Sequence, residues 1–334
     1  MMLDWRKLLG AIVLVTAALH SSFAASGPTA GKLLAEGRVD DAILLLQSRI
    51  SSAPGDAESY NFLCRAYFML GEWDSGIAAC EKSVSLRADN GEYHSWLGQI
   101  YGEKADHSSF ITAARIAAKV RSEFETAVQL NPSSVDAHAD LADFYVEAPR
   151  VVGGGKDKAK EQAQEIAVLD PAQAHRVEAR IAEAKKDYTT AENEYRIAIH
   201  LSGGKAGTWL NLAGFYRHTG RLDEMEDAIR NATAPKMNRA DVLVGAAELL
   251  INAKRDFPEA TQLLRRYMAS GATVEDAPVF KARYLLGTIL EREGDLQAAA
   301  EQYRAALFLA KRFSPARDAL NRLKHPTQSR MKSD

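Results

Sequence analysis

Two cysteines, Cys64 and Cys80, are the only thiols in this chain of 334 residues. Such a pair can form one disulfide, or it can remain as two buried thiols that pack like small apolar side chains. An oxidising compartment favours the disulfide, and closing so short a loop would contribute about 3 kcal/mol in the chain-entropy picture. The two alternatives stay open at this point.

A glycine-rich stretch, VVGGGKDK at residues 151–158, has the superficial look of a phosphate-binding loop. A true P-loop has Gly, four residues and then Gly-Lys-Ser/Thr, and it follows a strand. Here Arg150 occupies the place of the first Gly, Asp157 occupies the place of Ser or Thr, and no strand pattern precedes them. We therefore expect no nucleotide site, and we predict a flexible, expanded turn because glycine resists helix formation.

The eight histidines form no metal or catalytic motif, and the sequence contains no HExxH, CxxC or Gly-x-Ser-x-Gly pattern. His94, His138 and His175 recur near the start of successive helical segments. We interpret them as partly buried against neighbouring segments. The sequence thus predicts no metal, no cofactor and no enzymatic activity.

The N-terminal segment has the organisation of a secretory signal peptide. Arg6 and Lys7 precede the apolar run Leu8–Leu19, and the small residues Ser22 and Ala24 follow it. The run is too short for a comfortable membrane span, which needs about 20 residues. We expect residues 1–24 to be removed, which predicts a periplasmic or secreted protein that does not span the membrane afterwards. An uncleaved anchor is the alternative.

The composition favours a helical, globular chain. The chain is 46% hydrophobic and 26% charged, with only 10 prolines and a formal net charge of -2. Abundant Ala, Leu, Glu, Arg and Lys favour helix. Nucleic-acid binders are usually basic, so we expect no nucleic-acid partner.

These residues are positioned by a helical repeat. In each unit a small residue is followed four positions later by a bulky one, and successive units are separated by 34, 44, 39, 32, 34, 35 and 39 residues. The small positions are Ala42, Gly76, Val120, Ala159, Ala191, Met225, Ala260 and Ala299, and their partners are Leu46, Cys80, Phe124, Ala163, Tyr195, Ile229, Leu264 and Tyr303. The clearest unit, residues 282–310, reads as two helices around Gly294, packed through small residues such as Gly287 and Ala299.

This pattern resembles the tetratricopeptide repeat, a helix–turn–helix unit of about 34 residues. The resemblance covers residues 28–324 and implies an all-α fold, an α-solenoid or right-handed superhelix of about eight helix pairs. Residues 315–324 are predicted to form a capping helix that buries Ala319 and Leu320. The third unit carries an insertion at residues 104–113. Residues 325–334 are predicted to be a disordered polar tail, which ends a C-terminal stretch of net charge +5 from residue 311.

The resemblance also places the two cysteines and a groove. Cys64 takes the small position of a first helix and Cys80 the bulky position of the second helix in the same unit, so both side chains face the interior of the hairpin. In the family, first helices line the concave face, where partners usually bind. Carried over by position, the implied groove residues are Asn61, Arg65, Phe68, Met69, Gln99, Glu103, Asp143, Glu147, Arg176, Arg180, Arg217 and Tyr284. Phe68 and Met69 are expected to be exposed anchors for a peptide.

The hypothesis from sequence is an exported scaffold or adaptor that binds a protein or peptide in its concave groove, in cell-envelope assembly or secretion. The alternative is a glycan- or lipid-binding solenoid, hydrolytic if Glu103, Asp143 and Glu147 converge in one pocket. A third reading is a structural array that assembles with itself.

Overall fold

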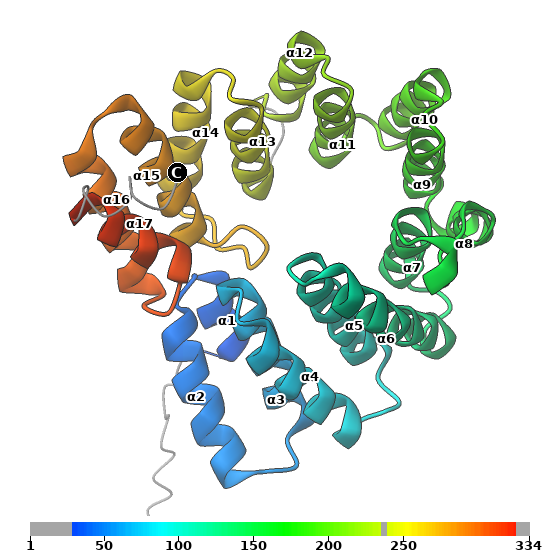
Figure 1. The fold of residues 1–334 in the computed structure, drawn as a ribbon, viewed down its shortest axis with the longest axis horizontal. Helices are drawn as coiled ribbons and strands as arrows, with labels where there is room; N and C mark the ends of the chain where they lie inside the picture. The colour runs from blue at the N-terminus through cyan, green and yellow to red at the C-terminus, as the bar shows by residue number, and fades with distance from the viewer. Residues whose placement is uncertain (1–28, 235–238, 325–334) are drawn as a thin grey trace, which may run out of the picture.

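The protein is described by a computed structural model that covers residues 29–234 and 239–324. The predicted signal peptide and the predicted disordered tail lie outside these residues. Over the described ranges the chain forms eight helix pairs and one further helix, with no strand (Figure 1). The first helices are α1 (Ala30–Ala35), α3 (Ala57–Leu70), α5 (Gly91–Asp106), α7 (Val135–Glu147), α9 (Pro171–Ala184), α11 (Ala206–His218), α13 (Ala240–Ala253) and α15 (Val279–Glu293). The second helices are α2 (Val39–Ser52), α4 (Trp73–Leu86), α6 (Phe110–Leu130), α8 (Lys156–Leu169), α10 (Tyr188–Leu201), α12 (Leu222–Ala232), α14 (Phe257–Ala269) and α16 (Leu296–Leu309).

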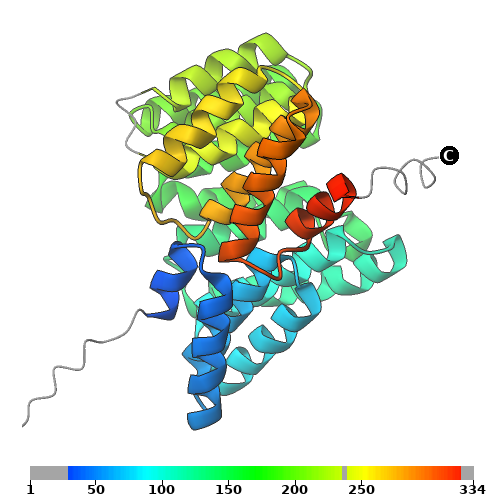
Figure 2. The same ribbon diagram turned by 90° about the vertical axis from the view of Figure 1, so that its left-hand side faces the viewer.

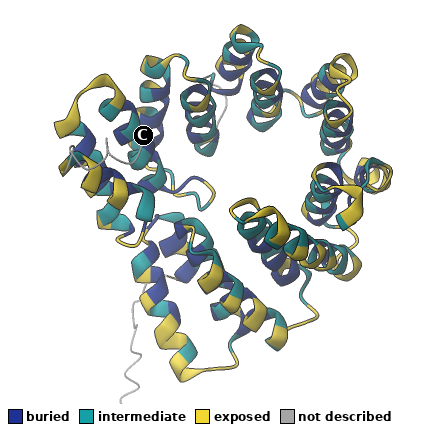
Figure 3. Ribbon diagram, viewed as in Figure 1, coloured by how far each residue is buried: buried dark blue, intermediate teal, exposed yellow. Residues whose placement is uncertain are grey.

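The predicted repeat register is confirmed. Each small and bulky alignment position lies on the second helix of its pair, and all of them are buried. The capping helix α17 (Ser314–Lys324) is also present, with Ala319 and Leu320 buried as predicted. Buried residues lie where helices face one another, and exposed residues cover much of the outer helices (Figure 3). The all-α solenoid therefore follows from a spacing that places one small and one bulky side chain in each hairpin.

In the third and eighth pairs the bulky residue of the second helix packs against a glycine of the first helix. A Cβ atom added to Gly98 would lie 2.5 Å from the ring of Phe124, and one added to Gly287 would lie 2.5 Å from the ring of Tyr303. In the second pair the same place is taken by a disulfide between Cys64 and Cys80, whose Cα atoms are 5.2 Å apart. The cysteines thus link α3 to α4 covalently where the third and eighth pairs place a ring above a glycine.

Replacing Gly98 with alanine is expected to lower the free energy of unfolding by about 1–3 kcal/mol, because the added methyl group forces the buried Phe124 ring to move. Chemical denaturation measures the change. Gly102, on the same helix, is the matched control, since an added Cβ atom meets nothing within 4 Å there. Gly102→Ala should be neutral or stabilising by up to about 1 kcal/mol, as helix propensity predicts. Equal effects of the two substitutions would contradict the close packing at Gly98.

The insertion in the third unit is helical. It lengthens α5 to 16 residues and α6 to 21 residues, and only three residues separate the two helices. The extended end packs on α4, where the rings of His107 and Trp73 lie 5.4 Å apart and Lys104 pairs with Asp74 at 3.0 Å. The extra residues therefore add contacts within the array.

The glycine-rich turn is compact, which corrects the prediction that it is flexible. A short 3-10 helix, η1 (Arg150–Val152), is followed by Gly153 in the left-handed region at φ +99°. The Gly155 amide donates a hydrogen bond to the Tyr145 carbonyl at 2.8 Å, and a Cβ atom on Gly154 would overlap the Ala148 carbonyl group. The glycines permit this close backbone approach, which explains their presence without any ligand.

The array closes into a ring, so that α15–α17 lie beside α1–α3 (Figures 1 and 2). We call this contact the seam, formed by Gly37, Asp40, Tyr67 and Glu72 on one side and Phe280, Lys311 and Arg312 on the other. The Lys311 amide donates to Asp40 at 2.5 Å, and the Arg312 Nε donates to Glu72 at 2.8 Å. The Arg312 guanidinium also lies 5.2 Å from the ring centre of Tyr67. One apolar core runs through both sides of the seam, so the basic residue Arg312 is part of the closed fold and not of a free tail.

Candidate functional site

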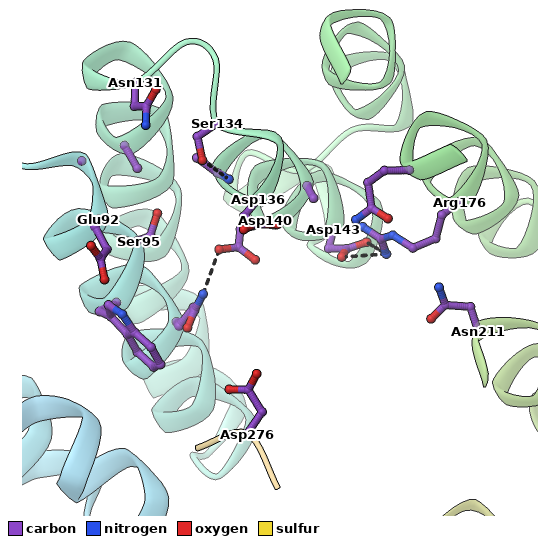
Figure 4. A pocket seen from close by; sticks show the side chains of 17 residues that line it. Glu92, Ser95, Asn131, Ser134, Asp136, Asp140, Asp143, Arg176, Asn211 and Asp276 are labelled. Carbon is purple, nitrogen blue, oxygen red and sulfur yellow. Dashed lines mark hydrogen bonds and ion pairs between the residues drawn. The ribbon is translucent and has the colours of Figure 1, made fainter. Parts of the chain in front are cut away.

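The inner face of the ring contains a cavity of about 810 Å³, which we call the inner cavity (Figure 4). It crosses four successive helix pairs, because α5, α7, α9 and α11 each present one face to it. Its walls are formed by Gly91, Glu92, Ser95, Trp96, Gln99, Ala127, Asn131, Ser134, Asp136, Ala137, Ala139, Asp140, Asp143, Gln173, Arg176, Asn211 and Asp276.

Helical spacing accounts for most of these walls. On α7, Asp136, Asp140 and Asp143 are four and three residues apart, so they lie on one side of the helix. The helix is fixed at its start by Ser134, whose hydroxyl accepts a hydrogen bond from the Ala137 amide at 3.2 Å. Glu92, Trp96 and Gln99 follow the same spacing on α5. The inner cavity is therefore built from equivalent faces of neighbouring first helices.

One wall comes from the connection between α14 and α15, residues 270–278, which points into the ring (Figure 1). The buried Tyr267 hydroxyl donates a hydrogen bond to the Ala277 carbonyl and holds the end of this loop. Asp276 lines the inner cavity, and Glu275 receives two hydrogen bonds from Arg65, at 2.8 and 2.6 Å. The loop thus connects the seventh and eighth pairs to the inner faces of the second and third.

The charge of the inner cavity is strongly negative. Glu92, Asp136, Asp140, Asp143 and Asp276 line it, and Arg176 is the one cationic side chain among the lining residues. Arg176 is already bound to Asp143 at 3.1 Å. Burial raises the pKa of Asp140 to about 6, helped by the nearby negative charges of Asp143 and Asp136 and opposed by a 2.9 Å hydrogen bond from Gln99. The raised pKa therefore reflects mainly the burial of Asp140, with a smaller contribution from the neighbouring carboxylates.

Three of the predicted groove residues, Gln99, Asp143 and Arg176, line the inner cavity. Glu147 and Arg180 line a separate cavity of about 530 Å³ near the other ends of α7 and α9. In both places charges pair between neighbouring first helices, because Arg176 binds Asp143 and Arg180 binds Glu147, each 33 residues away. The arginines therefore neutralise carboxylates of the preceding unit.

The predicted anchors Phe68 and Met69 are half-buried, which corrects the expectation that they are exposed. The Phe68 ring packs edge-to-face on Trp73 and on Trp96, each at 5.7 Å, and Met69 packs on the core. Trp96 belongs to α5 of the next pair, so the neighbouring unit covers Phe68. Asn61 is also buried, with 3% of its surface exposed, so it cannot act as a groove surface in this conformation.

The other predicted groove residues lie outside the inner cavity. Arg65 is held between the rings of Phe62 and Trp96, at 4.8 and 5.0 Å, and is occupied by Glu275. Tyr284 faces the C-terminal core, with its ring 5.4 Å from that of Phe313. Glu103 and Arg217 are half-buried on α5 and α11, and neither lines the cavity.

The three carboxylates of the enzymatic alternative do not converge. Asp143 lines the inner cavity, Glu147 lines the second cavity, and Glu103 lines neither. Residues 29–234 and 239–324 contain no group of three or more His, Cys, Asp or Glu side chains placed to hold a metal ion. Within the same ranges, no helix combines the length and apolar character needed to cross a bilayer.

The recurring histidines connect the two helices of their own pair. The Nδ1 atoms of His94, His138 and His175 lie 2.6, 2.7 and 2.5 Å from Glu123, Gln162 and Glu194. Each partner directly precedes the bulky position of the second helix. The other ring nitrogens of His94 and His138 contact backbone carbonyls of the preceding turn, at 3.1 and 3.0 Å. These side chains fix helix starts within each hairpin, and the neighbouring repeat that we expected as their partner is not involved in these bonds.

Replacing His94 with glutamine is expected to destabilise the protein more at about pH 6 than at about pH 9, by about 1–2 kcal/mol. The hydrogen bond to Glu123 raises the pKa of His94 above its ordinary 6.5. The stability that charged His94 contributes is fully present when the pH is below the pKa of His94 in the unfolded chain. It disappears as the pH rises through the higher pKa of His94 in the folded protein. Urea unfolding at both pH values measures it. The exposed His200 is the control, and a pH-independent loss in His94→Gln would contradict the charged hydrogen bond.

Three of the carboxylates that line the inner cavity, Asp136, Asp140 and Asp276, were not predicted from the sequence. Asp136 and Asp140 were detectable, since they precede the predicted Asp143 by one and two helical turns on the same face. Asp276 carried no such signal, because it belongs to a loop that reaches the inner cavity only when the ring closes.

Comparison with known proteins supports the same fold. Two family models described as tetratricopeptide repeat match residues 33–100 and 245–319. No curated protein matches the sequence. The crystal structure of yeast Tom70 is similar with a TM-score of 0.53 and 16% identity, and the match covers 89% of this chain and 60% of that one. A thermophilic TPR protein from Thermus thermophilus matches with a TM-score of 0.45 and 18% identity, covering 66% of this chain and 95% of that one.

Proposed function

Because this chain is a tetratricopeptide repeat protein, a kind of protein-interaction scaffold, we propose that it binds an extended protein segment along the inner face of its ring. The observation that carries the proposal is the inner cavity, which passes over four successive first helices. A binding surface built from equivalent faces of stacked units is the usual consequence of a repeat architecture.

The inner cavity adjoins two further cavities. It shares Gln173 and Asn211 with a neighbouring cavity of about 510 Å³, and Asp276 with another of about 520 Å³. Ligand sites for small molecules are typically enclosed and largely apolar. A connected, polar series of cavities suits an extended chain, whose backbone amides can bond to side chains such as Gln173 and Asn211.

The proposal includes export. The N-terminal residues have the pattern of a signal peptide, and a disulfide such as Cys64–Cys80 persists in oxidising compartments. We therefore place the protein in the periplasm or outside the cell, where it would hold a partner protein during envelope assembly or secretion.

Site-specific photocrosslinking in the native host tests the binding face. A photoreactive residue at Ser95 or Asn211, both in the inner cavity, should yield a discrete crosslinked protein. The same residue at the exposed Lys160 of α8, which lines none of the cavities described above, is the control. Identical products from Ser95 and Lys160, or no product from Ser95 and Asn211, would contradict binding at the inner face. Fractionation of the same cells tests export.

A further inference from the structure

We infer that the segment bound in the inner cavity is basic, with lysine or arginine side chains directed at the α7 wall. This inference rests on the proposed function and adds the chemistry of the partner to it. Charge complementarity carries this inference, across a cavity whose walls come from α5, the end of α6 and its connection to α7, α7, α9, α11 and loop 270–278.

Three carboxylates of the inner cavity, Asp136, Asp140 and Asp276, have no direct ion pair with a described residue. Asp140 is bonded to the neutral Gln99, and Arg239 lies close enough to Asp276 to interact with it electrostatically but forms its ion pair with Asp241. Glu92 lies 3.7 Å from Arg65, but Arg65 directs its stronger bonds to Glu275. Only Asp143 has a full partner, Arg176. A cationic ligand would supply a direct partner for Asp136, Asp140 and Asp276.

In the second cavity, the one lined by Glu147 and Arg180, basic side chains of the ring itself contact the carboxylates. There Glu147 is bound by Arg180, and Glu183 is bound by His218 at 3.0 Å. Both carboxylates of the second cavity thus contact a basic side chain of the following unit, whereas in the inner cavity, among the described residues, only Asp143 and Glu92 have a basic side chain within 4 Å. The difference selects the inner cavity as the place where a positively charged partner gains most.

Trp96 adds a surface suited to cations. Its indole ring already lies 5.0 Å from the guanidinium of Arg65, and the half-buried side chain also forms part of the cavity wall beside Glu92. Aromatic faces attract ammonium and guanidinium groups, most strongly at tryptophan. An acidic segment would instead meet like charges at every position along α7, which costs binding energy.

Fluorescence anisotropy with the full exported chain tests the inference. The probes are three labelled unstructured peptides of equal length that carry lysine, glutamine or glutamate at the same positions. We expect the lysine peptide to bind most tightly, with affinity that falls as salt rises. Asp136→Asn combined with Asp140→Asn should weaken it about tenfold at low salt, equivalent to about 1.4 kcal/mol.

The matched control is Asp157→Asn combined with Glu165→Gln, two exposed carboxylates of α8 that change the net charge equally. It should leave the affinity within about twofold. Equal weakening by both double variants would show non-specific attraction and overturn the inference. Tighter binding of the glutamine or glutamate peptide would also overturn it. If Ser95 still crosslinks a partner in those cases, the proposed function survives, whereas failure of both experiments removes the two together.

Discussion

Replacing Phe280 with alanine is expected to lower the free energy of unfolding by about 3–5 kcal/mol and to open the ring. Phe280 is fully buried at the seam. Its ring packs 5.0 Å from that of Phe313, and a Cβ atom added to Gly37 would lie 3.4 Å from it. Truncation would leave a cavity between the first and last helix pairs, within the apolar core that runs through both sides of the seam.

Two measurements separate opening from simple destabilisation. Hydrogen exchange should accelerate in α1, α2 and α17 before it changes in the middle of the array, and small-angle scattering should give a larger radius of gyration. Repeat arrays unfold from their ends when the contacts at the ends weaken. The midpoint of a single denaturation curve therefore cannot distinguish opening of the ring from a general loss of stability. The control is Phe308→Ala, since Phe308 is 84% exposed on α16. A Phe280→Ala protein with unchanged scattering and unchanged exchange at both ends would contradict the closed ring.

Removing the disulfide with Cys64→Ala and Cys80→Ala together is expected to cost about 3 kcal/mol of stability. The two residues are 16 positions apart and fully buried between α3 and α4. The bond restricts the unfolded chain, and its loss also leaves space where other pairs place a ring over a glycine. Because Tyr67 of α3 and Glu72, which follows it, contact Arg312 at the seam, exchange should increase there as well.

Denaturation of the oxidised protein, the reduced protein and the double variant measures this effect. The reduced wild-type chain should approach the variant. Mass analysis after alkylation under denaturing conditions provides the direct control, since the oxidised protein should take up no label and the reduced protein two. Full labelling without reductant would show that the protein holds free thiols, and the stability difference should then vanish.

The ring is relevant to the proposed binding because loop 270–278 meets the second and third pairs across it, Glu275 through Arg65 and Asp276 as a wall of the inner cavity. An open ring should therefore move Asp276 away from the other carboxylates of the inner cavity. The Phe280→Ala variant thus provides a second, independent way to weaken the binding of a basic peptide without altering any residue of the inner cavity.

The repeat itself is encoded in local spacing. The alternation of a small and a bulky residue four positions apart is a property of one helix and its nearest neighbour, so it can be read from the sequence alone. It correctly predicted eight helix pairs, the buried alignment positions, the cap and the shared hairpin interior of Cys64 and Cys80. The groove positions carried over from the family were less informative, since Phe68 and Asn61 proved to be covered by adjacent units.

Which inner-face charges remain unpaired depends instead on the closed ring. Arg65 meets Glu275 across 210 residues and Arg312 meets Glu72 across 240, because small rotations at each repeat accumulate until the two ends touch. No local pattern in the sequence encodes this accumulated rotation. The same accumulation places loop 270–278 opposite α7 and thereby completes an acidic cavity whose separate residues look like ordinary solvated helix faces in the sequence.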